Sequence, residues 1–233
     1  MNDFSFYASL HFGHNELQPS FTRRLTPYQR WDDVAIRMCD VVGAALAIFL
    51  CAPLMLIIAV SIYVKDPGPI LFMHTRLGRG GRTFPCFKFR SMVVDADARL
   101  RYVLATDPKA RAEWALFHKL NKDPRVTPLG YFLRRTSLDE LPQFFNVLLG
   151  DMSLVGSRPI VAAEMPRYGR YAWSYSAHRP GLTGLWQIGG RSSTSYQRRI
   201  AHDVLWSRRR CFFLYCVVLF KTVPAVLRAE GSC

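Results

Sequence analysis

The chain has 233 residues, of which 50% are hydrophobic and 21% charged, and its formal net charge at pH 7 is +14. This length suits one sizeable domain with an attached anchor, and the hydrophobic content excludes a largely disordered chain. A net charge this positive predicts an anionic partner. Charge alone leaves nucleic acid, anionic lipid and a phosphorylated substrate equally open.

The termini and the cysteines carry little functional signal. Met1 to Arg30 lacks the apolar core of a secretory signal, so we interpret it as a variable leader. The six cysteines form no CxxC pair and no cluster with histidine at zinc-ligand spacing. We therefore expect free, structural thiols in a reducing compartment rather than a disulfide scaffold.

The longest uncharged stretch runs over 24 residues from Val41 to Val64. At about 1.5 Å per residue, a helix of this length reaches about 36 Å and can cross a hydrocarbon core of roughly 30 Å. However, Pro53 lies at its middle, where a proline kinks a helix, and basic residues flank both ends, which places both flanks in the cytoplasm. Two forms stay open: a re-entrant helix-break-helix over residues 31–65, and one kinked spanning helix.

The rest of the chain is mainly α with a small β element. The breaker cluster Asp66 to Pro69 precedes two short apolar segments joined through Gly80-Gly81, which predict a β-hairpin. The helical regions are 95–120, with a break at Asp107-Pro108, then 128–149 and 196–227. Within the last region, Cys211 to Phe220 is compatible with an amphipathic helix in the membrane interface and with a buried core helix.

Two adjacent carboxylates, those of Asp139 and Glu140, are the strongest candidates for a catalytic role. The spacing of Ser137 and Glu140 matches a capping box, so an ordinary helix start is one interpretation. The other is catalytic: one carboxylate attacks phosphorus while the other holds Mg²⁺, which prefers one or two carboxylates plus phosphate oxygens and water. Phosphoryl transfer also needs positive groups around the phosphate. The candidates are Lys88, Arg90, Arg134, Arg135 and Arg158.

In this order, these segments resemble the small monotopic phosphoglycosyl transferases, also named bacterial sugar transferases. The resemblance covers about Val34 to Leu227. The matching segments are the apolar run with Pro53, DPGPILF, RLGRGGRTF, KFRSM, DPRVTPLGYFLRRTSLDELPQFFNVLLGDMSLVGSRP and RPGLTGLWQIGGR. A match this long is far more specific than any single motif.

The resemblance implies a reaction and its residues. Asp139 matches the nucleophile that attacks the β-phosphorus of a UDP-sugar with loss of UMP, Glu140 matches the residue that binds Mg²⁺, and Pro53 matches the break of the re-entrant helix. Undecaprenyl phosphate then attacks the covalent aspartyl-phosphosugar, in ping-pong order. The motifs also imply a set of phosphate-binding residues: Lys88, Arg90, Arg134 and Arg158.

The resemblance further implies a place and partners. Residues 66–233 form a cytoplasmic, membrane-associated catalytic domain at the bacterial inner membrane, with interfacial amphipathic helices. The implied partners are UDP-hexose, undecaprenyl phosphate, inner-membrane lipids and downstream glycosyltransferases, with no nucleic acid; a homodimer is compatible. His74 and the ending KTVPAVLRAEG resemble the exopolysaccharide-production branch. That branch is similar to undecaprenyl-phosphate galactose phosphotransferases, so galactose-1-phosphate is the first expectation for the transferred group and glucose-1-phosphate the next.

Four positions depart from the family pattern, and the first is Ala52, which stands before Pro53 where the family often has serine. Ser157 stands where GPRP has its first proline, which is expected to loosen the loop that holds Arg158. The Asp-x-x-Tyr segment appears as Asp203 to Trp206, and Tyr215 replaces a later aspartate. Two other functions therefore stay open: a membrane-anchored module that binds anionic lipid or nucleic acid, and a scaffold that has lost activity. The lack of a nucleic-acid motif and the retained carboxylate pair favour the enzyme.

Overall fold

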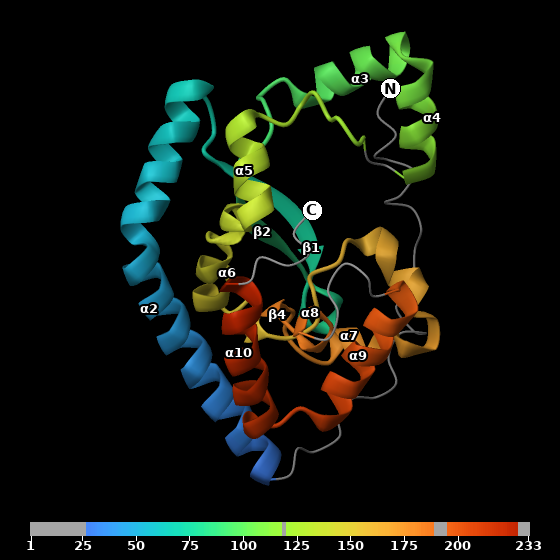
Figure 1. The fold of residues 1–233 in the computed structure, drawn as a ribbon. Helices are drawn as coiled ribbons and strands as arrows, with labels where there is room; N and C mark the ends of the chain where they lie inside the picture. The colour runs from blue at the N-terminus through green and yellow to red at the C-terminus, as the bar shows by residue number, and fades with distance from the viewer. Residues whose placement is uncertain (1–26, 118–119, 189–194, 228–233) are drawn as a thin grey trace.

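Helices predominate in the computed structural model, which describes residues 27–117, 120–188 and 195–227 (Figure 1). The predicted mainly α fold with a small β element is confirmed. Most of the predicted leader, Met1 to Arg30, lies outside the described residues, as does Cys233. The elements in chain order are α2 (Pro27–Lys65), β1 (Leu71–Leu77), η1 (Arg79–Gly81), β2 (Thr83–Phe89), α3 (Ala96–Thr106), α4 (Pro108–Phe117), α5 (Pro128–Thr136), η2 (Leu138–Glu140), α6 (Gln143–Leu149), β3 (Ser153–Val155), η3 (Ala162–Tyr171), α7 (Ala172–Ser176), β4 (Gly181–Thr183), α8 (Leu185–Ile188), α9 (Tyr196–Arg209) and α10 (Phe212–Leu227).

Helix α2 is a single helix of 39 residues, which corresponds to about 58 Å. Figure 1 shows it, blue to cyan, along one side of the molecule. The segment Arg30–Lys65 is the one helix within the described residues that is long and apolar enough to cross a membrane, by length and composition. The helix continues through Pro53, so the break predicted at this residue is not present in the backbone.

The packing of α2 explains why its path stays helical at the proline. Ile36 and Ala44 near its start belong to a core with residues of α6 and α10, and Ile58 and Ile62 near its end belong to a core with residues of β2 and α5. The outer side of α2 exposes large apolar side chains: Val42, Leu46, Phe49, Leu50, Ile57 and Val60. Both ends of α2 thus lie against one domain, while the outer side is available to lipid.

A buried carboxylate fixes the start of this apolar stretch. Asp40 is 1% exposed, and its Oδ1 accepts hydrogen bonds from Ser153 Oγ at 2.9 Å, from the Leu154 backbone N–H at 2.8 Å and from Tyr215 Oη at 2.8 Å. These bonds join α2 to β3 and α10. Tyr215, which departs from the family pattern, is therefore part of this anchor.

The strands form two separate pairs. β1 and β2 make the predicted antiparallel hairpin, with Leu71 opposite Phe89, and the turn between them uses Gly80 and Gly81 at φ values of 69° and 75°. A second pair, β3 and β4, is parallel. It was not predicted, because each of its strands has three residues.

The helical region predicted over 128–149 is divided into α5 and α6 by the turn η2. Ser137 ends α5 with a φ of 58°, in the left-handed region, and its side chain makes no capping hydrogen bond to η2. The predicted capping box of Ser137 and Glu140 is therefore wrong, because an N-cap residue needs an extended backbone. The break predicted at Asp107-Pro108 is confirmed as the boundary between α3 and α4.

The region predicted over 196–227 also contains two helices, α9 and α10. In α10, Tyr215 and Val218 are fully buried, whereas Phe213 and Phe220 are 77% and 85% exposed. The core interpretation of Cys211 to Phe220 is confirmed for one side of the helix. The membrane-interface interpretation stays a prediction for the exposed side.

We expect Asp40→Ala to lower the stability of the fold by roughly 2–4 kcal/mol, because three donors in the interior lose their acceptor. Thermal unfolding in one detergent, followed by tryptophan fluorescence, measures the loss. Asp95→Ala is the matched control, since the Asp95 side chain is 56% exposed and its one ion-pair partner among the described residues is Arg99, four residues on. Equal melting temperatures for the two variants would contradict the anchor.

Candidate functional site

Four sequence segments meet around a cavity of about 350 Å³, measured with its open mouth, which we term the carboxylate cavity. Lys88 comes from β2, Glu140 from η2, Arg158 from the loop after β3, and Gln187 from α8. The cavity is lined by Arg76, Cys86, Lys88, Glu140, Gln143, Arg158, Pro159, Gly181, Leu182 and Gln187. Asp139 is not among the lining residues; it is 7% exposed, and its Oδ2 lies 3.6 Å from Nζ of the lining residue Lys88.

A single ammonium group joins the two carboxylates. Lys88 Nζ lies 2.6 Å from Glu140 Oε1 and 3.6 Å from Asp139 Oδ2. The Asp139 side chain is 10% exposed and that of Glu140 is 35% exposed, so the second carboxylate is the more open to solvent. The two acidic residues therefore face the same point.

The surroundings shift the pKa values of the two carboxyls in opposite directions. Burial raises the pKa of Asp139, and the charge of Glu140 adds to this, while Lys88 and Arg134 oppose it. Burial alone would also raise the pKa of Glu140, but the charge and hydrogen bond of Lys88, with help from Arg158, lower it below its usual value. Glu140 thus stays anionic, while Asp139 is the more basic carboxylate, an arrangement that suits two different roles.

A buried amide sets the distance between β2 and the carboxylates. Asn146 of α6 is fully buried; its Oδ1 accepts from the Phe87 backbone N–H at 2.9 Å and its Nδ2 donates to the Pro85 carbonyl at 2.7 Å. Because α6 follows η2 directly, these bonds hold Lys88 in register with Asp139 and Glu140.

The loop that carries Arg158 is supported from two sides. The Ser157 carbonyl accepts from the Gly181 backbone N–H at 2.8 Å, and Ser157 is also hydrogen-bonded to Asp203. A Cβ on Gly181 would lie 2.0 Å from the backbone nitrogen of Gly156, so this strand contact requires glycine. Contrary to the expected loosening, Ser157 is 4% exposed and well held.

The four predicted phosphate-binding residues are not all brought together. Lys88 and Arg158 line the carboxylate cavity. Arg134 donates to Ser91 Oγ at 2.9 Å, and its charge acts on Asp139, so it lies beside the pair. Arg90 does not line the cavity; its Nη2 is 3.5 Å from Asp66 Oδ2, and it secures the loop before β1.

Among the lining residues that the sequence analysis missed, Arg76 and Gln187 have the clearest chemical significance. Arg76 lies opposite Phe84 in the hairpin, on the same side as Lys88, and Gln187 has a buried Oε1 without a hydrogen-bond partner among the described residues. Both belong to segments that carried the resemblance. The sequence does not show that these two side chains face the cavity. For Arg76 this follows from the strand register, and for Gln187 from the pairing of β3 with β4, the strand before α8.

The donor set fits the predicted Mg²⁺. No group of three or more His, Cys, Asp or Glu side chains that could hold a metal occurs within the described residues. Mg²⁺ needs only one or two carboxylates when phosphate oxygens and water complete its shell, and Glu140 supplies one. The metal remains a prediction that rests on the chemistry of this pair.

Asp203 allows a test of the support under Arg158. Burial raises the pKa of Asp203 to about 6, although hydrogen bonds from Tyr168 and Ser157 lower it. The folded protein therefore binds one more proton than the unfolded chain between pH values of about 4 and about 6, so stability is lost as the pH rises through this window. In Asp203→Asn, the fall in the free energy of unfolding across this pH window should be smaller by roughly 1–3 kcal/mol, since one unit of pKa shift corresponds to about 1.4 kcal/mol.

Thermal unfolding of the wild type and Asp203→Asn, measured from pH 4 to 7, tests this expectation. Asp97→Asn, a change at an exposed position of α3, should keep the profile of the wild type. Parallel profiles for wild type and Asp203→Asn would show that Asp203 is not protonated in the fold.

The chain was compared with known proteins. The family model described as bacterial sugar transferase matches residues 31–229. The chain is 45% identical over 196 residues to an undecaprenyl-phosphate galactose phosphotransferase of Salmonella typhimurium, covering 84% of this chain and 41% of that protein. It is 43% identical over 199 residues to the exopolysaccharide production protein ExoY of Rhizobium meliloti, covering 85% and 88% of the two chains.

A third relative carries a different sugar in its name. The chain is 39% identical over 209 residues to a UDP-glucose:undecaprenyl-phosphate glucose-1-phosphate transferase of Caulobacter vibrioides, covering 86% of this chain and 72% of that protein. The chain thus spans about two fifths of the Salmonella protein's length, 41%, but most of the length of the other two.

Proposed function

Because this chain belongs to the bacterial sugar transferase family, we propose that it transfers a hexose-1-phosphate from a UDP-sugar to undecaprenyl phosphate and releases UMP. This reaction would be the first step in building an exopolysaccharide repeat unit. The observation that carries the proposal is the carboxylate pair at one ammonium group, with pKa values shifted in opposite directions.

The proposed reaction has two displacements at one phosphorus atom. First, an Oδ of Asp139 attacks the β-phosphorus of the UDP-sugar, the bond from that phosphorus to the bridging oxygen breaks, and UMP leaves with the bond's electron pair. Next, a phosphate oxygen of undecaprenyl phosphate attacks the same phosphorus, and the bond to Asp139 breaks. The carboxylate is restored, and the product is a lipid-linked diphosphate sugar.

The positive side chains have a defined part in this scheme. Lys88 lies between the carboxylates, and Arg158 and Arg76 line the same cavity, so all three can contact the anionic oxygens of a diphosphate. Mg²⁺, when bound through Glu140, would supply further neutralisation of the phosphate charge. Gln187, whose Oε1 lacks a protein partner among the described residues, is placed to accept a hydrogen bond from a sugar hydroxyl or the nucleotide.

Galactose-1-phosphate is the proposed group, with glucose-1-phosphate as the competing choice. The Salmonella relative is named for galactose and the Caulobacter relative for glucose. The sequence identity to the Salmonella relative is higher, but substitution of one or two side chains in a cavity can change the preference between two such similar hexoses. The choice of sugar therefore needs a measurement.

The test is UMP release by purified protein with undecaprenyl phosphate and Mg²⁺, using UDP-galactose, UDP-glucose and their N-acetyl forms as donors. We expect release with UDP-galactose, and we expect Asp139→Asn to lower it by roughly 10³-fold or more, since the nucleophile is lost. Without acceptor, intact-protein mass spectrometry should find phosphohexose on the wild type and none on Asp139→Asn. Asp97→Asn, at an exposed position of α3, is the matched control.

Two results would contradict this proposal. Turnover of Asp139→Asn near that of the wild type would exclude Asp139 as the nucleophile. Silence with every donor, from folded and detergent-stable wild type, would favour a scaffold without this activity.

We further propose that α2 is a re-entrant, monotopic anchor on the cytoplasmic face of the inner membrane. Ile36 near one end and Ile62 near the other both pack on the same domain, which favours a helix that stays on one side of the bilayer. Because α2 is continuous through Pro53, the proposal rests on this packing at both ends and not on a break at the proline.

Single cysteines at Trp31 and at Lys65, in a chain without native cysteines, test this topology. Both positions are exposed and flank the apolar stretch. We expect a membrane-impermeant maleimide to label neither in cells with an intact inner membrane and both after permeabilisation. Labelling of one position in intact cells would show that α2 spans the membrane.

A further inference from the structure

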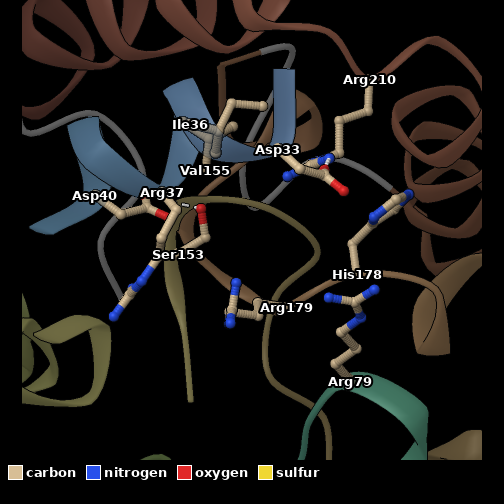
Figure 2. A pocket seen from close by; sticks show the side chains of 10 residues that line it. All are labelled: Asp33, Ile36, Arg37, Asp40, Arg79, Ser153, Val155, His178, Arg179 and Arg210. Atoms are coloured by element: carbon tan, nitrogen blue, oxygen red, sulfur yellow. Dashed lines mark hydrogen bonds and ion pairs between the residues drawn. The ribbon is translucent and has the colours of Figure 1, made fainter. Parts of the chain in front are cut away.

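A second cavity, of about 420 Å³ with its open mouth, lies where the first turns of α2 meet β3, the hairpin turn and the start of α10. Figure 2 shows its side chains, with guanidinium groups from four different elements or loops around it. We term it the arginine cavity; its charged lining residues are Asp33, Arg37, Asp40, Arg79, Arg179 and Arg210. It shares no lining residue with the carboxylate cavity.

The acidic side chains of the arginine cavity are already engaged. Asp33 is paired with Arg210, and Figure 2 shows these two side chains meeting on one side of the cavity. Asp40 accepts its three hydrogen bonds from Ser153, Leu154 and Tyr215, as described above. Neither carboxylate has an ion pair with the three remaining arginines.

Those three arginines keep an unneutralised positive charge. Arg37 donates to the carbonyls of Val147 at 2.8 Å and Leu148 at 3.0 Å, and Arg179 donates its Nε–H to the Gly150 carbonyl at 2.6 Å. Carbonyl oxygens satisfy a guanidinium group but do not cancel its charge. The side chain of Arg79 has neither a hydrogen bond nor an ion pair among the described residues.

Like charges crowd this space. Burial lowers the pKa of Arg179, and the charges of Arg37, Arg79 and Arg210 lower it further, against a smaller opposite effect of Asp40. Burial also lowers the pKa of His178 to about 4, so this side chain is neutral at pH 7 and adds no charge. Converging cations that no acid neutralises are stabilised when an anion enters.

We infer that the arginine cavity binds a phosphate group, carried by an anionic membrane phospholipid or by a small soluble phosphate. A guanidinium group can donate two parallel hydrogen bonds to two oxygens of one phosphate. Arg79 and Arg179 both retain free N–H donors for such a bidentate contact. The cavity also lies where both exposed apolar helices begin. Arg37 and Asp40 directly precede the apolar stretch of α2, and Arg210 directly precedes α10 with its exposed Phe213. A lipid headgroup in the cavity could leave its acyl chains on those faces.

The experiment uses the full chain in a neutral detergent and measures the rise in melting temperature with two probes. One probe is inorganic phosphate, and the other is phosphatidylglycerol in mixed micelles, compared with phosphatidylcholine. Because a ligand that binds only the folded state raises the melting temperature, we expect stabilisation of the wild type by at least one probe and none by phosphatidylcholine. Stabilisation by phosphatidylglycerol alone assigns the site to a lipid headgroup, and stabilisation by both assigns it to any accessible phosphate.

The decisive variant is Arg79→Gln. Because the side chain of Arg79 has no protein partner among the described residues, the melting temperature of this variant without ligand should match that of the wild type. Its half-saturating concentration for the effective probe should rise about tenfold, the effect of removing one charge-assisted contact. Arg82→Gln is the matched control: the same charge change, three residues away in the same hairpin turn and outside the cavity.

The inference is overturned if neither probe stabilises the wild type, or if Arg79→Gln and Arg82→Gln respond alike. Arg179→Gln provides a second variant from another loop, and it should weaken binding in the same direction. Because melting temperature is the readout, these results are independent of whether the protein transfers a sugar phosphate.

Discussion

The structure depends on one buried carboxylate, that of Asp40, which lies in α2 just before the apolar stretch of this helix. A carboxylate in the interior is costly unless hydrogen bonds satisfy it, and Asp40 is satisfied only where α2, β3 and α10 meet in one arrangement. This arrangement directs the inner side of α2 into two cores and leaves its outer side apolar and exposed. It also fixes β3, which leads directly to Ser157 and Arg158. The same bonds thus constrain the membrane-facing helix and one wall of the carboxylate cavity.

In that cavity, one lysine gives two neighbouring acids different properties. Lys88 is held by the hairpin, and the hairpin is held to α6 by Asn146. The ammonium lies 1.0 Å closer to Glu140 than to Asp139, at 2.6 Å against 3.6 Å, so its charge overcomes burial at the first and not at the second. Position rather than residue type therefore separates the two carboxylates, and this separation suits the two roles proposed for them, nucleophile and metal ligand.

The sequence predicted those features that depend on local chemistry. The hairpin followed from Gly80-Gly81, the break between α3 and α4 from Asp107-Pro108, and the position of the acidic pair from a long family match. It failed where long-range packing decides. The backbone at Pro53 stays helical because both halves of α2 pack on the domain. The capping box of Ser137 was wrong for a local reason: Ser137 ends α5 as a left-handed C-cap, with its backbone N–H bonded to the carbonyls of Leu133 and Arg134. Arg90 and Arg76 have similar sequence surroundings, yet only the strand register shows that Arg76 faces the cavity.

The excess of positive charge, which composition alone could not assign, divides into two kinds in the structure. In the carboxylate cavity, Lys88 and Arg76 have acidic partners, so their charge is largely balanced until a substrate diphosphate competes for them. In the arginine cavity, two guanidinium groups donate to carbonyls, the side chain of Arg79 has no partner among the described residues, and the acids nearby are engaged elsewhere. A balanced cluster can exchange partners during a reaction, whereas an unbalanced one is stabilised by an anion that stays. This difference supports the two proposals: turnover in the first cavity, and in the second a bound phosphate that secures the protein where its two apolar helices begin.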